Sequence, residues 1–321
     1  MTTQHSKNHT LLIGKETTFG TAVTPTKDIG LIQNFSPADK REIQKVYSTG
    51  SRETQCLVLG KLDLSWDFEI NLQHGRIFEY LLGSVSHTQT TSDWKHTFDI
   101  ATNLPSFTIE DSFNSTTDSV FMYAGSKLSE GTISVDTDGL LTFKGTGISK
   151  SVDVSGSSAS SSVISSLCPL HFKHTTLKSG TAGSETSVGK LQKYSLNIKN
   201  DVEGIYSAGN IDIQEAIAKN LEITFDFDIA FEDTTEYQKF LGGTTPQTSP
   251  SSFSFVFNSN NGVTLGSGRR EFNAQLTGVN YEEVGTPVNV GDIVIQSFKG
   301  SATGLGTDKI YYVDNISETA F

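Results

Sequence analysis

The sequence has few of the residues that cross-link small domains or bind metal ions. Only two cysteines, Cys56 and Cys168, occur among 321 residues, so we expect no disulfide framework and a reducing compartment during folding. No stretch approaches the roughly 18 apolar residues of a membrane-spanning helix. The polar segment Met1–Asn8 is not followed by an apolar run. We therefore expect no secretory signal and no membrane insertion.

Basic residues are also scarce. The chain has 24 Lys and Arg against 36 Asp and Glu, a net charge of −12. Residues 1–160 carry 13 basic and 18 acidic side chains and residues 161–321 carry 11 and 18, so the acidity is spread over both halves. Binding to nucleic acid by phosphate neutralisation needs clustered Lys and Arg. This composition argues against it.

The local motifs of common active sites are missing. The sequence contains no GxSxG nucleophile elbow and no GxxxxGK[ST] phosphate-binding loop. Cys168, His171 and His174 lie close together, but they lack a second ligand pair and a standard tetrahedral zinc spacing. We therefore expect no enzymatic activity, no cofactor and no metal ion.

One segment, in contrast, is written twice. Leu62–Ile70 (LDLSWDFEI) recurs in the second half of the chain as Leu221–Ile229 (LEITFDFDI). The match runs without a gap from residues 47–83 to residues 206–242, and it begins with YSTG in the first copy and YSAG in the second. A match at a fixed separation is typical of a repeated structural unit. The sequence therefore predicts a duplicated domain.

Apolar and polar residues alternate along this segment. Period two predicts a β-strand with one buried face, and burial contributes roughly 1.5–3 kcal/mol for each large apolar side chain. The other face carries mainly carboxylates, namely Asp63, Ser65, Asp67 and Glu69 in the first copy and Glu222, Thr224, Asp226 and Asp228 in the second. This face is either an ordinary solvated surface or a surface whose acidity serves a function.

Most of the remaining sequence has strand patterns. Apolar residues at helical spacing in His74–Leu82, followed by Gly83, predict a short helix after the main strand of each copy. Residues 213–219 look helical alone, but the equivalent residues of the first copy do not, so we expect an extended or irregular segment. Further on, FKGTG from Phe143 matches FKGSA from Phe298, at a separation slightly shorter than that of the main strands.

Composition suggests the domain boundaries, since the stretch Ser151–Ser166 is almost all Ser, Val, Gly and Ala, as in a flexible connector. The expected parts are an N-terminal arm (1–27), a first domain (28–155), a Ser- and Gly-rich linker or loop (156–190), a second domain (191–305) and a C-terminal arm (306–321).

The order of these motifs resembles the tail tube proteins of tailed viruses. In the first half, GKETTFGTAVTPT (14–26) precedes a strand, YSTGSRE, the main strand and FEYLLG. In the second, KYSLNIKNDVEGIYSAG precedes LEITFDFDIAFEDTTEYQKFLGG. The resemblance covers most of residues 11–300. It implies an all-β fold of two tandem β-sandwich or split-barrel domains, each with one short helix.

The resemblance also implies a function and partners. Proteins of this family form rings whose inner sheets join into a β-barrel, and the rings stack into the tail tube of the virion. Two tandem domains imply a trimeric ring with pseudo-sixfold symmetry, and a hexameric ring is the alternative. Other tail proteins would cap the tube, and synthesis would take place in the host cytoplasm. Residues 36–45 and both terminal arms are the expected contacts between rings.

A channel wall rich in Asp and Glu would let DNA pass without specific binding. We therefore expect the eight polar residues of the two main strands, Asp63 to Glu69 and Glu222 to Asp228, to face the lumen. A face turned outward to solvent remains open. So does a different class of protein, a β-sandwich that binds carbohydrate or acts as an adhesive surface protein. Trp66 lies on the apolar face of its strand, which argues against a sugar-stacking platform.

Overall fold

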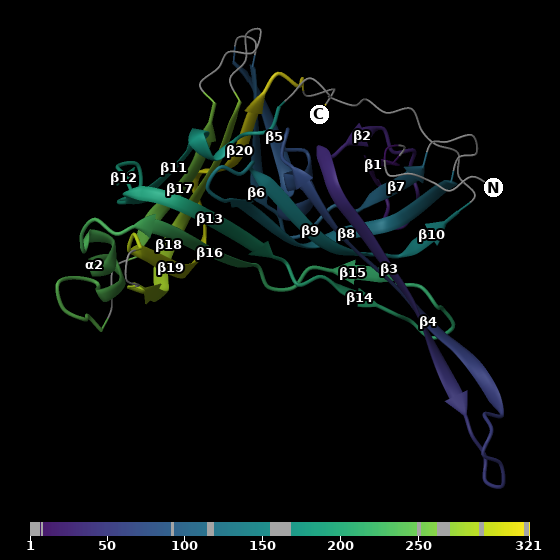
Figure 1. Cartoon of the computed structure of the whole chain (residues 1–321). Coiled ribbons are helices and arrows are strands. Elements are labelled where there is room, and N and C mark those ends of the chain that lie inside the picture. The colour runs from purple at the N-terminus through teal and green to yellow at the C-terminus, as the bar shows by residue number, and fades with distance from the viewer. Residues whose placement is uncertain are drawn as a thin grey trace.

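The chain is an arch of antiparallel β-strands with two short α-helices (Figure 1), seen here in a computed structural model. The structure describes residue 7 and residues 9–90, 93–113, 119–154, 168–248, 252–261, 270–288, 292–317 and 321. The expected all-β fold is confirmed. No helix in this described part is long and apolar enough to cross a membrane.

The elements fall into two runs along the chain. The first half contains β1 (His9–Lys15), β2 (Lys27–Asp28), β3 (Leu31–Val46), β4 (Cys56–Asn71), α1 (Ile77–Leu82), β5 (Gly83–Thr90), β6 (Asp93–Ile100), β7 (Phe107–Phe113), β8 (Ser119–Val135), β9 (Thr142–Ser149) and β10 (Ser151–Asp153). The second half contains η2 (Phe172–His174), β11 (Thr175–Gly180), β12 (Thr186–Ser187), β13 (Lys190–Lys199), β14 (Glu203–Ile205), β15 (Glu215–Ile217), β16 (Glu222–Ala230), α2 (Thr235–Leu241), β17 (Phe253–Asn260), β18 (Glu271–Gly285), β19 (Ile295–Ala302) and β20 (Gly304–Asp314).

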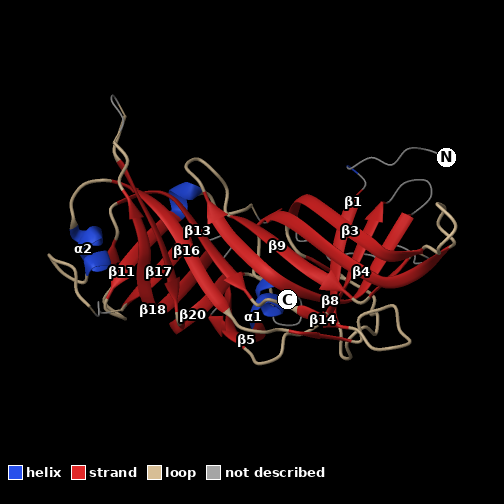
Figure 2. Cartoon of the chain, turned by 90° about the horizontal axis from the view of Figure 1, so that it is seen from below, coloured by secondary structure: helices blue, strands red, loops and turns tan. Residues whose placement is uncertain are grey.

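Three sheets contain these strands apart from β14 and β15, which form a separate two-stranded sheet. The inner sheet has the order β3-β4-β9-β8-β13-β16-β19-β18 and lies on the concave side of the arch (Figure 2). One outer sheet belongs to the first half, with the order β2-β1-β7-β8-β10. The other has the order β12-β11-β17-β18-β20-β6-β5. The long strands β8 and β18 each run from the inner sheet into an outer sheet.

The core lies between the inner sheet and the outer sheets. Alternate residues of β4, from Leu64 to Ile70, are buried, and so are those of β16, from Ile223 to Ile229. The ring centroids of Phe227 and Phe298 are 4.8 Å apart and stacked. The period-two pattern of the sequence therefore predicted the buried face of both strands correctly.

The two halves pair their strands in the same register. Phe35 lies opposite Phe68 in β3–β4, and Tyr194 lies opposite Phe227 in β13–β16. Both residues of the second pair follow their counterparts at the offset that relates Leu62 to Leu221, which we call the main-strand offset. Both ladders also shift register at the corresponding point, just after Ile32 in β3 and just after Leu191 in β13.

One sequence alignment is wrong by two residues. Matching FKGTG with FKGSA equates Phe143 with Phe298, but Phe298 lies opposite Phe227, whereas Phe143 lies opposite Ile70. In register, the counterpart of Phe298 is Gly145, which lies opposite Phe68. The bulky ring that the local match relied on therefore occupies different rows of the two ladders.

The predicted short helix follows the main strand in both halves. Helix α1 ends at Gly83, with φ 105°, and α2 ends at Gly242, with φ 79°. These left-handed conformations favour glycine because it has no Cβ. Residues 213–219, predicted to be extended or irregular, include the short strand β15. The first half adds the hairpin β5–β6 directly after α1, and β6 pairs with β20 of the second half.

Parts of the expected arms and linker form strands of the outer sheets. Residues 9–15 of the N-terminal arm form β1, whose Leu11, Leu12 and Ile13 are buried, and the Glu16 carboxylate after it accepts hydrogen bonds from Ser106 and Thr108. The C-terminal arm contains most of β20, and the linker contains β11 and β12, while its residues 156–167 lie outside the described residues. Residues 36–45, the expected contact between rings, belong to β3.

These segments are rich in polar residues, so their strands are hard to recognise in the sequence. A strand needs only alternate apolar residues, and a single buried row suffices at the edge of a sheet. The short strands β1 and β11 each contribute such a row.

Glycines opposite aromatic rings provide a test of the packing. In β9, Gly147 lies opposite Trp66, and a Cβ there would overlap the indole ring and the Lys127 carbonyl. We expect Gly147→Ala to lower the free energy of unfolding by about 1–3 kcal/mol. Gly304→Ala is the control, because no atom lies within 4 Å of its Cβ position. Urea unfolding of both variants measures the difference, and equal stabilities would contradict this packing.

Candidate functional site

The concave face of the inner sheet carries the eight predicted residues. They alternate with the buried rows of β4 and β16, so they share one face of the inner sheet. Asp63, Asp67 and Glu222 are exposed, whereas the other five are half-buried by neighbouring side chains. The structure thus brings the two predicted sets together on one continuous surface.

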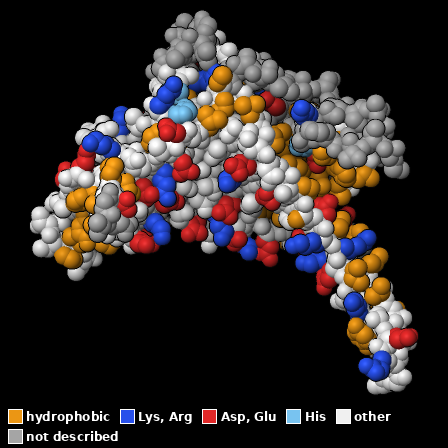
Figure 3. Space-filling view, in the orientation of Figure 1, with side chains coloured by type: hydrophobic (Ala, Val, Ile, Leu, Met, Phe, Trp, Pro, Cys, Tyr) orange, Lys and Arg blue, Asp and Glu red, His pale blue; other side chains and the backbone are white. Residues whose placement is uncertain are grey.

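Lysines on neighbouring strands make this face a mixture of charges. Lys144 in β9 lies 3.2 Å from Glu69, Lys193 in β13 lies 3.3 Å from Asp228, and Lys299 in β19 lies 2.8 Å from Glu283. Red and blue side chains alternate along the concave margin in Figure 3. These pairs could not be predicted from the sequence, because cross-strand neighbours are defined only once the register is known.

The carboxyl of Asp226 has a raised pKa. Burial raises its pKa, the Lys193 ammonium lowers it, and the Asp228 carboxylate raises it again, so the net direction is upward. Its counterpart in the first half, Asp67, is exposed. The two halves thus present similar residues in unequal environments.

The inner sheet ends in two open edges of opposite charge. Among the described strands, β3 pairs with β4 alone, and its exposed side chains include Lys40 and Arg41. At the other end, residues 280–285 of β18 pair with β19 and expose Glu282 and Glu283. An open edge presents unpaired main-chain N–H and C=O groups and is a template for pairing with another chain.

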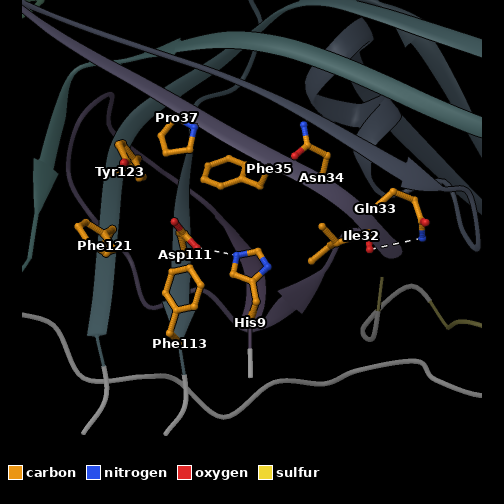
Figure 4. A pocket seen from close by; sticks show the side chains of 10 residues that line it. All are labelled: His9, Ile32, Gln33, Asn34, Phe35, Pro37, Asp111, Phe113, Phe121 and Tyr123. Carbon is orange, nitrogen blue, oxygen red and sulfur yellow. Dashed lines mark hydrogen bonds and ion pairs between the residues drawn. The ribbon is translucent and has the colours of Figure 1, made fainter. Parts of the chain in front are cut away.

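A cavity of about 480 Å³ opens beside the β3 edge (Figure 4). Its wall combines aromatic rings from β3, β7 and β8 with one polar pair, in which the imidazole of His9 lies 2.6 Å from Asp111. Burial raises the pKa of Tyr123, so its phenol stays protonated and donates to Asp39. Among its described lining residues there is no Ser, Thr, Cys or Lys to act as a nucleophile. It is a recess of mixed apolar and polar side chains at a sheet edge.

A serine and a lysine meet under α2. The Lys239 ammonium lies 2.5 Å from both the Ser179 hydroxyl and the Glu236 carboxylate, which also accepts from the Tyr281 hydroxyl at 2.9 Å. Serine–lysine pairs act as nucleophile and base in some hydrolases. Here Ser179 is fully buried and Lys239 is ion-paired. The cluster attaches α2 to β11 and β18.

The histidines singled out in the sequence close a local turn. The His171 Nδ1 accepts from the main-chain N–H of Lys173, and the His174 ring accepts from that of His171. Together they cap the short 3-10 helix η2. Within the described residues, no group of three or more His, Cys, Asp or Glu is arranged to hold a metal ion.

These features define an all-β protein whose main sheet carries a charged concave face and ends in two open edges. The family model of the phage tail tube protein matches residues 6–302, so the chain belongs to the phage tail tube protein family. This match confirms, at the level of the family, the resemblance inferred from the sequence. The family is one of structural proteins. No curated protein matches the chain.

The environment of Asp226 predicts a pH-dependent stability difference. Because its folded-state pKa is raised, stability falls as pH rises from the ordinary value of 3.8 through that pKa. We expect Asp226→Asn to raise the melting temperature at pH 7, with the advantage disappearing near pH 3, where both side chains are neutral. Asp67→Asn is the matched control and should change stability less, since Asp67 is exposed. A destabilised Asp226→Asn at pH 7 would contradict this account.

Proposed function

We propose that the chain assembles into stacked rings that form the tube of a phage tail, through which the genome passes. The observation that carries this proposal is the pairing of β8 with β13. There, residues 130–135 of the first half pair with residues 194–199 of the second, so one inner sheet crosses both halves. A ring needs the same kind of pairing between one chain and the next.

The strand order supports a duplication behind this arrangement. The inner sheet consists of β3-β4-β9-β8 from the first half and β13-β16-β19-β18 from the second, in equivalent order. The pair of Leu128 and Gly147 corresponds to the pair of Tyr281 and Gly300, and a register shift follows Leu128 and Tyr281 alike. We call the offset from Leu128 to Tyr281 the edge-strand offset. Each half therefore offers one edge like β8 and one edge like β13.

The internal junction serves as a template for ring closure. Glu130 lies opposite Lys199 at this junction. Adding the edge-strand offset to Glu130 gives Glu283, and subtracting the main-strand offset from Lys199 gives Lys40. The same register therefore places Glu283 of one copy opposite Lys40 of the next. Opposite charges in a cross-strand pair favour this register.

The template also accounts for the recess beside β3. Val135 lies opposite Tyr194 at the internal junction, and Tyr194 is only 1 % exposed. The corresponding residues are Val288, which is 74 % exposed, and Phe35, which lines the recess. Ring closure would bring Val288 against Phe35 and shield apolar surface that each chain exposes alone.

Three chains per ring follow from two equivalent units per chain. Both halves contribute four strands to the inner sheet, so three copies supply six similar segments in a pseudo-sixfold ring. A hexamer is the alternative and would require one half of each chain to lie outside the ring wall. The continuous inner sheet favours the trimer.

The concave face would then line the lumen. Carboxylates outnumber lysines among its charged residues, which include Asp63, Asp67, Glu69, Glu130, Glu222, Asp226, Asp228, Glu282 and Glu283 against Lys40, Lys61, Lys144, Lys193, Lys199 and Lys299. Lysines paired with carboxylates are poor partners for DNA phosphates, so the wall repels DNA weakly and binds it little. Carboxylates found on the outer wall of an assembled tube would overturn this assignment.

The carbohydrate-binding alternative has less support. Trp66 is 2 % exposed and donates its indole N–H to Ser149 within the core, so it offers no platform for a sugar ring. Negative-stain electron microscopy of the purified protein separates the two functions. Rings or tubes support the tail tube, and a monomer retained on glycan resin would overturn it.

Charge exchange tests the predicted closure. We expect Lys40→Glu alone, or Glu283→Lys alone, to prevent ring formation, and the two changes together to restore it. If each of three junctions loses about 1.4 kcal/mol, closed rings become about a thousandfold less abundant. Light scattering after size exclusion measures the oligomer.

Lys178→Glu is the control for the charge exchange, because Lys178 is exposed on the outer strand β11, away from both edges. Rings that persist in both single variants, or a double variant that stays monomeric, would contradict this register.

A further inference from the structure

The ends of β3 and β4 form a long hairpin that projects from the arch with apolar side chains in solvent (Figures 1 and 3). We call residues 43–59 the clasp hairpin. Its exposed large apolar residues are Ile43, Val46, Tyr47, Leu57, Val58 and Leu59. A two-stranded hairpin is marginally stable in water unless its apolar side chains pack against something. In the described part of the chain, these side chains stay exposed.

The second half contains the same hairpin in a docked position. Strands β14 and β15 pair Gly204 with Ala216, and the main-strand offset relates this pair to Lys45 and Leu57 in the clasp hairpin. Unlike the clasp hairpin, β14–β15 lies against the first half, and its Ala216 is 2 % exposed where Leu57 is 60 % exposed.

Three hydrogen bonds hold β14–β15 to the first half. The main-chain N–H of Leu62 donates to the Ile211 carbonyl at 2.9 Å, and the Tyr206 hydroxyl donates to the Leu62 carbonyl at 3.1 Å. The Lys127 ammonium donates to the Ala216 carbonyl at 2.7 Å. All three contacts therefore cross the junction between the halves.

The docked hairpin β14–β15 and the projecting clasp hairpin differ by a bend where each leaves the inner sheet. In the second half, β13 ends at Lys199 and β14 begins at Glu203. The corresponding residues 41–43 carry a register shift in β3, and Gly60 lies beside Glu42 there. The same three positions are thus a break in one half and a bulge in the other. A bulge already bends its strand and opens its ladder locally.

We propose that the clasp hairpin bends at this bulge and docks on the second half of the neighbouring copy in the ring, as β14–β15 docks on the first half within one chain. This inference rests on the proposed ring, because closure brings a second half beside β3. Tyr47 takes the place of Tyr206 and donates to the Leu221 carbonyl of the neighbour. Leu57 takes the place of Ala216 and becomes buried.

The receiving surface has matching chemistry. Asn280 stands where Lys127 stands in the first half, so its side-chain amide replaces the ammonium as donor to the Leu57 carbonyl. Glu282 occupies the position of Ser129, at the bend. It faces the part of β3 just before the clasp hairpin, which carries Lys40 and Arg41. A second copy of this chain therefore fits the hairpin in register, donors and charge.

Photo-cross-linking locates the hairpin in the assembled protein. We expect p-benzoylphenylalanine in place of Tyr47 to cross-link to residues 220–222 of another copy, identified by mass spectrometry. The same substitution at Tyr206 is the matched control and should cross-link to residues 61–63 of its own chain. Lys40→Glu, which opens the ring, should abolish the first cross-link and retain the second.

Leu57→Asp is a second test, because Leu57 is exposed in the monomer. We expect this variant to keep the melting temperature of the monomer and to lose the cross-link from position 47. Rings that form normally while position 47 cross-links to another surface, or to none, would overturn the clasp and leave the tube function intact. If the unmodified protein formed no rings or tubes, both the clasp and the tube function would be overturned.

Discussion

The need to pair main-chain groups at the ends of a sheet determines the architecture of this protein. Each half builds a four-stranded segment of the inner sheet, and each segment has two edges with unpaired N–H and C=O groups. Within the chain, β8 and β13 satisfy one edge of each half by pairing with each other. The two remaining edges, on β3 and β18, carry opposite charges and the matching register shifts. Pairing of these two edges between copies of the chain would complete the main-chain hydrogen bonding of the inner sheet.

The core explains why the two halves keep the same register although few residues are identical. Trp66 and Phe225 each lie opposite a glycine, Gly147 and Gly300, because a ring of that size leaves no room for a Cβ on the paired strand. A slip of one residue would turn every buried side chain towards the concave face. Packing of this kind preserves the position of the edges, and the position of the edges determines how copies can join.

The sequence predicted what depends on period and repetition. The buried rows of β4 and β16, the helices ending at Gly83 and Gly242, and the all-β class follow from local patterns and one long repeat. It did not reveal β1, β11 or the lysine partners of Glu69 and Asp228. Those features depend on which strands become neighbours, and neighbours in a sheet are distant in sequence. The open edges could not be predicted for the same reason, since an edge is defined by pairing that one chain leaves incomplete.

The differences between the halves are as informative as their likeness. Some counterparts that pack within the chain, such as Trp66 and Phe225, are similar in size and polarity. At the two hairpins, where the second one docks within the chain and the first one projects from it, the counterparts differ. Its docked hairpin has Ala216 against the first half, whereas the clasp hairpin has Leu57 in solvent, and Lys127 is replaced by Asn280. Two surfaces under one packing constraint would tend to keep the same side chains. Their divergence indicates that the first hairpin is adapted to a second half, whose receiving surface differs from that of a first half.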